Sequence, residues 1–282
     1  MDTRLIFLDI DGTFIEPGRM EAPASAVEAV RAARANGHKV FLCTGRNYKM
    51  TAPVLHYGFD GYVCSAGGYV VCGQDFLFDC PMDKAQSDGV RALLEANGVE
   101  CTLEAKNATY GGAQMIQRLS SYQARQGGAL NSELERWRRA FADGMLIRPL
   151  EEYKGEPIYK ICYIAQDAAS LLPAKEAYGG QFNFCETETF KPEGPACING
   201  ELINRKFNKG EGIRRICQHL GLTTAAAVAF GDSENDLEMT DVAAVSYCMA
   251  NGSPALKARC THVCPAVSDD GIATAFKELG LI

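Results

Sequence analysis

The stretch RLIFLDIDGT (residues 4–13) decides the fold of this chain. Its first five residues form a short, mostly apolar run typical of a buried strand, and the polar cluster Asp9–Thr13 ends that run. Open α/β sheets bind ligands at the carboxyl ends of their strands, which is where Asp9 and Asp11 stand. Two carboxylates this close repel each other unless a cation lies between them, and Mg²⁺ suits such a setting. Taken alone, the pattern is also compatible with a solvated Asp-Gly turn.

Outward from this stretch, predicted strands and helices alternate, and such alternation implies a parallel α/β sheet. Pro23 suits the first turn of a helix that Gly37 can close. Gly73-Gln74 lies between two short apolar runs and indicates a hairpin turn. The expected helices cover residues 22–36 and 210–220, and the expected strands cover 4–8, 39–43, 61–64, 70–72, 76–78 and 226–230.

The middle of the chain has a different pattern. A helix is expected to end at Gly98, strands are expected at 101–103, 159–165 and 182–185, and Ser132-x-x-Glu135 predicts a capping box. We therefore expect a parallel α/β core of residues 1–82 and 203–282, interrupted by an inserted α+β domain of residues 83–202.

Composition excludes several classes of protein. The 282 residues carry a net charge of −7 and are 47% hydrophobic, which argues against a disordered chain and against a general nucleic-acid binder. No run is apolar enough to span a membrane, and Asp2 and Asp9 interrupt the N-terminal apolar stretch, which argues against a signal peptide. The twelve cysteines are scattered and are expected to be reduced thiols. We expect a cytoplasmic protein, and the sequence leaves monomer and homodimer both open.

Three further motifs follow predicted strands or begin helices. In Thr44-Gly45-Arg46 a hydroxyl and backbone N–H groups can cradle phosphate oxygens, although a plain helix cap would look the same. Lys209 opens a helix, where its charge opposes the helix dipole, so either a neighbouring anion or bulk solvent must offset it. The run Gly231–Asp236 (GDSEND) places acids and an amide at another strand end, where a capped helix without ligands is the alternative.

Taken together, DxDGT (Asp9–Thr13), T-G-R (Thr44–Arg46), Lys209 in N-K-G and GDxxND (Gly231–Asp236) resemble the haloacid dehalogenase-like phosphatases, specifically the Cof-type class IIB branch. The resemblance covers nearly the whole chain and includes MANG at 249–252 and DDGIA at 269–273. It implies a Rossmann-like parallel-sheet core with an inserted α+β cap that selects the leaving group.

The resemblance also implies roles for single residues. Asp9 would be the nucleophile and a Mg²⁺ ligand, forming an aspartyl-phosphate. Asp11 would be the general acid and base, with its backbone carbonyl on the metal, and Asp232 would be the third protein contact to Mg²⁺. Thr44 and Lys209 would join Asp9 and Asp11 in catalysis, because phosphoryl transfer depends chiefly on positioning and charge stabilisation.

The implied contacts to phosphate come from Ile10, Thr44, Gly45, Lys209 and Asn235. Asp236 would orient Lys209 or the metal shell. Where the family often has an Asn-Gly-Ala-like turn, this chain has Ser65-Ala66-Gly67-Gly68, so a polar contact is missing at Ala66.

We therefore expect a Mg²⁺-dependent phosphatase of small phosphorylated metabolites. Sugar phosphates are the leading substrate class, and phosphorylated cofactors such as flavin mononucleotide or pyridoxal phosphate come next. Two alternatives remain: a sugar phosphomutase of the same superfamily, and a non-catalytic regulator that binds phosphometabolites.

Overall fold

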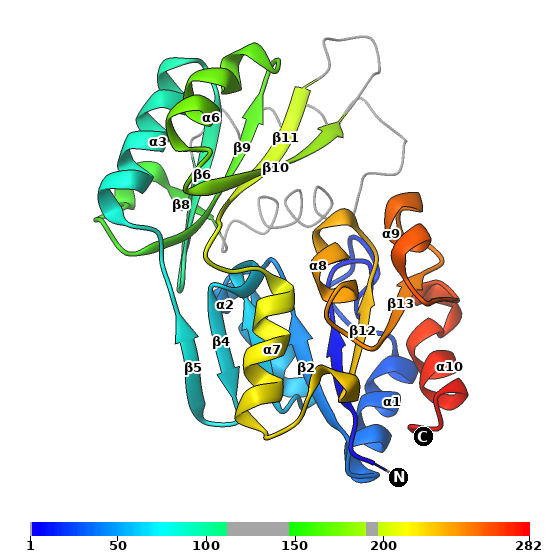
Figure 1. Ribbon diagram of the computed structural model, residues 1–282. Coiled ribbons are helices and arrows are strands. Elements are labelled where there is room, and N and C mark those ends of the chain that lie inside the picture. Colours follow the sequence, from blue (N-terminus) through cyan, green and yellow to red (C-terminus); the bar gives the residue numbers. More distant parts are fainter. Residues whose placement is uncertain (1, 112–146, 190–196) are drawn as a thin grey trace. The chain divides into compact units, whose positions relative to one another are not determined.

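The computed structural model of the chain describes residues 2–111, 147–189 and 197–282 (Figure 1). The described residues divide into two compact units. The first contains residues up to Asp79 and from Phe207 onward, and the second lies between Cys80 and Lys206. The helix predicted at Ser132 lies outside the described residues.

The described residues of the first unit form an eight-stranded sheet. Its strands are β1 (Leu5–Leu8), β2 (Lys39–Cys43), β3 (Gly61–Cys64), β4 (Tyr69–Cys72), β5 (Asp75–Asp79), β12 (Ala227–Gly231), β13 (Val245–Met249) and β14 (His262–Cys264). The strand order is β14-β13-β12-β1-β2-β3-β4-β5. Strands β14 to β3 are parallel, whereas β4 and β5 are antiparallel to their neighbours. The predicted parallel α/β core is confirmed, and β1 lies at its centre.

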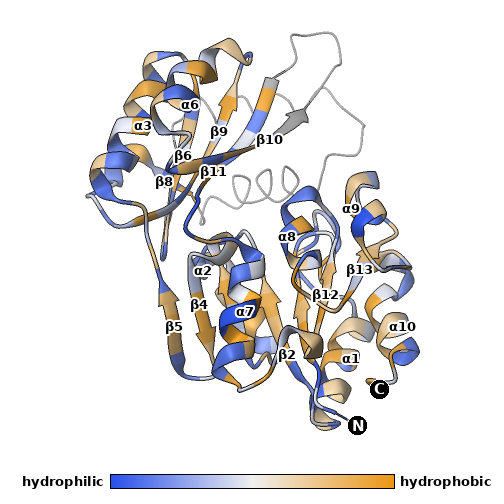
Figure 2. Cartoon of the chain, in the orientation of Figure 1, coloured by the Kyte–Doolittle hydropathy of each residue, from blue (hydrophilic) through white to orange (hydrophobic). Residues whose placement is uncertain are grey.

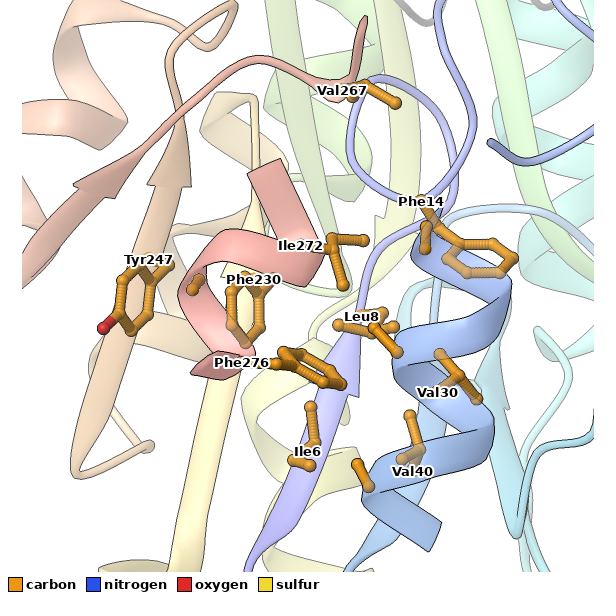
Figure 3. Packing of buried hydrophobic residues seen from close by; sticks show 14 of the residues in the cluster. Ile6, Leu8, Phe14, Val30, Val40, Phe230, Tyr247, Val267, Ile272 and Phe276 are labelled. Atoms are coloured by element: carbon orange, nitrogen blue, oxygen red, sulfur yellow. The ribbon is translucent and has the colours of Figure 1, made fainter. Parts of the chain in front are cut away.

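Helices cover both faces of this sheet, as the alternating side chains of β1 require. The helices of the unit are α1 (Ala24–Ala35), α2 (Tyr48–Thr51), α7 (Lys209–His219), α8 (Leu237–Thr240), α9 (Pro254–Arg259) and α10 (Gly271–Glu278). Ile6 and Leu8 pack with α1 and α10 (Figure 3), whereas Leu5 and Phe7 pack with α7 and α8. Figure 2 shows that the strands are mainly apolar. Burial of apolar surface in both layers contributes roughly 25 cal/mol per Å² to the free energy of folding, and this stabilises β1 at the centre of the sheet.

The second unit is a mixed α+β module. Its elements are α3 (Lys84–Ala96), β6 (Glu100–Ala105), β7 (Thr109–Gly111), β8 (Ile147–Pro149), β9 (Ile158–Ala165), α6 (Leu172–Tyr178), β10 (Phe182–Thr189) and β11 (Cys197–Asn204). The sheet order is β10-β11-β9-β6-β7-β8, and the pairings are antiparallel except that β8 runs parallel to β7. The expected domain limit between residues 202 and 203 falls inside β11.

One face of this second sheet is apolar and the other carries buried charge. Ile161 and Tyr163 of β9 belong to the apolar core that includes residues of α3 and α6. Lys160, on the opposite face of β9, is fully buried and contacts Glu201 of β11 and Glu104 of β6, the latter at 3.6 Å. A buried ion cluster of this kind adds little net stability, because desolvating the charges offsets their attraction, but losing one partner would be costly.

Several observed elements lacked a sequence signal. The strands β13 and β14 and the helices α9 and α10 were not predicted, because runs of three to eight residues are too short for a clear period. The matching elements agree closely, with α1 at 24–35 instead of 22–36 and α7 at 209–219 instead of 210–220. Within the described part of the chain, no helix has the length and apolarity to cross a membrane.

Candidate active site

The site begins where the parallel strands β1 and β12 end side by side. Leu8 pairs with Phe230, and the backbone N–H of Asp9 donates to the carbonyl of Phe230 at 3.0 Å. Asp232 follows β12 directly, so both carboxylates leave the sheet at the same edge. Among the described residues, carboxylate oxygens of Asp9, Asp232 and Asp236 lie within 4.8 Å of one another.

Gly12 makes this convergence sterically feasible. A Cβ at this position would lie 2.2 Å from Oδ2 of Asp232, and the φ of +82° is one that L side chains rarely adopt. The glycine of the DxDGT motif therefore does more than form a turn, because it leaves the space that the Asp232 carboxylate occupies.

Lys209 connects this acidic group to the other end of the chain. The helix α7 begins at Lys209, and the Asn208 side chain caps it by accepting the backbone N–H of Glu211 at 2.8 Å. The Lys209 side chain is 1% exposed, and its Nζ donates to Oδ1 of Asp9 at 2.7 Å and to Oδ1 of Asp236 at 2.6 Å. The lysine thus faces anions rather than solvent, which resolves the ambiguity in its sequence pattern.

Asp236 fixes both the lysine and the loop after β12. Its Oδ2 accepts the backbone N–H groups of Asp232 at 2.9 Å and Ser233 at 3.2 Å, while its Oδ1 is bound to Lys209. Asn235 lies beside them, with Oδ1 3.4 Å from the Nζ of Lys209 and 2.9 Å from the Ser233 hydroxyl. Asp236 is therefore placed to orient the side chain of Lys209 and the backbone of Asp232.

The electrostatics of the cluster favour an additional positive charge. Burial raises the pKa of Asp9 to about 7; Lys209 counteracts this rise, whereas Asp236 and Asp11 add to it. Burial lowers the pKa of Lys209, but Asp236 and Asp9 outweigh it and raise that pKa well above its ordinary value. The Lys209 ammonium group pairs with two of the three buried carboxylates, those of Asp9 and Asp236, and a hard divalent cation with oxygen ligands fits the remaining negative charge.

Asp11 is directed toward a different partner. Its carboxylate accepts two hydrogen bonds from Arg46, from Nε at 2.8 Å and from the second terminal nitrogen at 2.7 Å. The acidic group of Asp9, Asp232 and Asp236 does not include it among the described residues. Burial lowers the pKa of Arg46 and Asp11 raises it, with a net rise, so this guanidinium stays charged. Arg46 had no role assigned from the sequence.

The other predicted phosphate contacts lie on neighbouring loops. Ile10 directly follows Asp9 and is fully buried, and Thr44 and Gly45 follow β2, the parallel neighbour of β1. The Thr44 hydroxyl accepts the backbone N–H of Arg46 at 3.1 Å. The Sγ of Cys43, one residue earlier, lies 3.8 Å from the Lys209 carbonyl, so the end of β2 adjoins the start of α7.

The loop after β3 is also part of this assembly. Ser65, Ala66 and Gly67 have φ values of 50°, 55° and 108°, and a Cβ on Gly67 would lie 2.2 Å from the Asn208 carbonyl. This strained loop therefore packs against the residue that caps α7. Ala66, where the resemblance to the family led us to expect a polar side chain, is buried in this loop.

Asn251, like Arg46, lies at the site although the sequence predicted no role for it. Its Nδ2 donates to the Gly12 carbonyl at 2.7 Å, and its Oδ1 accepts the backbone N–H of Val267 at 3.2 Å. The side chain thereby ties the loop that follows Asp9 to the C-terminal segment. The motif at 249–252 was the only signal that could have indicated it.

Comparisons with known proteins show what this chain is similar to. A family model for haloacid dehalogenase-like hydrolases matches residues 6–276. An HMP-PP phosphatase of Yersinia enterocolitica is 28% identical over 90% of this chain and 86% of its own length. The 5-amino-6-(5-phospho-D-ribitylamino)uracil phosphatase YitU of Bacillus subtilis is 23% identical over 99% of this chain and 98% of its own. The solved structure of the HAD subclass IIB sugar phosphatase BT4131 has a TM-score of 0.75 at 22% identity, covering 99% of this chain and 100% of that one.

Proposed function

This chain belongs to the haloacid dehalogenase-like hydrolases and is a phosphatase, and we propose that it hydrolyses small phosphorylated metabolites through an aspartyl-phosphate on Asp9. The observation that carries the mechanism is the buried contact of Lys209 with both Asp9 and Asp236. A lysine in this place neutralises the charge of a phosphoryl group beside the attacking carboxylate.

The reaction has two steps that share one proton carrier. First, a carboxylate oxygen of Asp9 bonds to phosphorus, the bond to the leaving oxygen breaks, and the Asp11 carboxyl protonates that oxygen, so that an alcohol leaves. Next, Asp11 takes a proton from water while the water oxygen bonds to phosphorus and the bond to Asp9 breaks. Phosphate leaves, and both aspartates return to their starting states.

The residues present suit Mg²⁺. Asp9, Asp232 and the backbone carbonyl of Asp11 would hold the ion, and Gly12 leaves room for the Asp232 carboxylate. When bound, the cation supplies positive charge that offsets the repulsion between phosphate and these acids. Thr44, Gly45, Ile10 and Asn235 would hold the phosphate oxygens, and Asp236 would keep Lys209 in place.

For substrates we propose sugar phosphates first. The subclass IIB neighbour is named a sugar phosphatase, while the curated relatives are named for HMP-PP and for a phosphoribitylamino-uracil. Phosphorylated heterocyclic metabolites are therefore the second class to assay. We assign selection of the leaving group to the second unit, the inserted α+β module.

The test measures phosphate release from 4-nitrophenyl phosphate with Mg²⁺, with EDTA, and with the Asp9→Asn variant. We expect activity only in the wild-type protein with Mg²⁺, and strong turnover in EDTA or by Asp9→Asn would contradict the mechanism. A panel of sugar phosphates and phosphorylated heterocycles then ranks the classes by kcat/KM.

The same panel separates the two alternatives. A phosphomutase would need a bisphosphorylated activator and release little phosphate. A regulator would bind metabolites without turning them over, but such a protein has no need of Asp9, Asp11, Lys209 and Asp232 in this arrangement.

A further inference from the structure

Arg46 forms a bidentate pair with the carboxylate of Asp11. Its Nε and one terminal nitrogen bind the two carboxylate oxygens at 2.8 and 2.7 Å, and its other terminal nitrogen donates to the Met50 carbonyl at 3.2 Å. Both side chains are largely buried, with 14% and 16% of their surfaces exposed. Bidentate pairs of this kind define the plane of the carboxylate as well as its position.

The backbone around Arg46 is equally constrained. Its N–H donates to the Thr44 hydroxyl at 3.1 Å, and its carbonyl accepts the N–H of Ser65 at 2.8 Å. The loop that carries Thr44 therefore fixes the backbone of Arg46, and the Met50 carbonyl of α2 together with Asp11 fixes its guanidinium. It acts as a rigid support and not as a mobile surface charge.

The chemistry open to Asp11 depends on where its carboxylate lies relative to Asp9. Two residues away, Asp9 belongs to the acidic group that suits a cation, and a carboxylate drawn into that group could not exchange protons with the leaving oxygen. In the structure the Asp11 carboxylate is bound to Arg46 and is not one of the three described carboxylates that lie within 4.8 Å of one another.

We propose that Arg46 is the positioning residue for Asp11: its fork holds the carboxylate away from the acidic cluster and thereby reserves it for proton transfer. The inference rests on the proposed role of Asp11 as general acid and base. Arg46 itself touches neither the phosphoryl group nor the leaving group in this proposal.

The test is the Arg46→Lys variant assayed with two monoesters, a simple alkyl phosphate and 4-nitrophenyl phosphate. Lysine keeps the charge but cannot bind both carboxylate oxygens in one plane. The alkoxide of the alkyl ester needs a proton to leave, whereas 4-nitrophenolate does not. We expect kcat/KM to fall about 10- to 100-fold for the alkyl ester and less than about 3-fold for the aryl ester.

The second step gives an independent readout. Water activation needs Asp11 whatever group has left, so Arg46→Lys should release 4-nitrophenol in a burst of one equivalent followed by slow turnover. The ratio of the two kcat/KM values does not depend on how much of the variant is folded. A purely structural role for Arg46 would lower both values equally and give no burst.

Arg34→Lys is the matched control. Arg34 binds both oxygens of Asp60 at 2.9 and 3.0 Å in the same unit, away from the site. We expect it to leave both kcat/KM values unchanged. Equal losses on both esters, or no loss on either, would overturn the proposal for Arg46.

The Asp11→Asn variant distinguishes a failure of the inference about Arg46 from a failure of the proposed role of Asp11. If Asp11→Asn discriminates between the esters and Arg46→Lys does not, only the inference about Arg46 fails. If Asp11→Asn shows no discrimination, the proposed role of Asp11 fails and the inference falls with it, while the Asp9→Asn assay still judges the phosphatase mechanism.

Discussion

The Nζ of Lys209 lies 2.7 Å from Oδ1 of Asp9, although 200 positions separate the two residues in the chain. The same nitrogen reaches Asp236 at 2.6 Å, so one ammonium group joins the first strand, the start of α7 and the loop after β12. The site is thereby assembled from both ends of the chain, and it depends on the packing that brings those ends together.

Replacing Lys209 should damage both chemistry and folding. Lys209→Met keeps a similar length but leaves Asp9 and Asp236 buried without their cation, and breaking a buried pair costs about 3–5 kcal/mol. We expect kcat/KM to fall at least about 100-fold, since one preorganised charge supplies that much. Phosphate release and thermal melting measure the two effects. A variant with near wild-type turnover would contradict the role of Lys209.

Asp9→Asn should stabilise the metal-free protein at high pH. The pKa of Asp9 is about 7 when folded and 3.8 in an unstructured chain, so between these values the folded state holds a proton that the unfolded state has lost. Stability from this group is therefore lost as pH rises toward 7, and Asn removes the dependence. In EDTA we expect Asp9→Asn to melt about 2–6 °C above wild type near pH 8, with the difference shrinking near pH 5. An equal difference in melting temperature at both pH values would contradict a raised pKa of Asp9 in the folded protein.

Gly12→Ala should disable the site through one methyl group. The new Cβ would lie 2.2 Å from Oδ2 of Asp232 and must displace that carboxylate, so we expect at least about a 100-fold loss of kcat/KM and weaker Mg²⁺ binding by calorimetry. Gly37→Ala is the control, because Gly37 has a similar φ of +90° and nothing within 4 Å. It should cost about 1–2 kcal/mol of stability, because an L side chain disfavours this φ, and keep its activity. Equal activities in the two variants would refute this explanation.

Asn251→Ala should loosen the loop that follows Asp9. It removes the hydrogen bonds to the Gly12 carbonyl and from the Val267 N–H, at a cost of about 1–3 kcal/mol. We expect about a tenfold lower kcat, because the Gly12 loop then loses its fixed position.

Asn36→Ala is the matched control for Asn251. Its Nδ2 donates to the Leu281 carbonyl at 2.9 Å, another tether between the N-terminal region and the C-terminus, but far from the site. A similar fall in melting temperature with unchanged kcat is expected. An equal fall in kcat for both variants would show that Asn251 acts through stability alone.

Much of the fold could be predicted, and the exceptions have physical causes. The strands β1, β2, β3 and β12 stand out because each is a short apolar run followed by a cluster of polar or glycine residues. By contrast, β14 covers three residues, His262–Cys264, and exists because Met249 and its neighbours in β13 offer a parallel partner. No local pattern encodes such a strand.

The sequence by itself determined the fold class, the family and the positions of the acids, because strand ends and short motifs are local features. Only the tertiary structure decided that Lys209 faces Asp9 and Asp236, that Arg46 holds Asp11, and that Gly12 makes room for Asp232. These are contacts between residues far apart in the chain. They depend on where parallel strands end beside one another, and burial then decides which charges must pair.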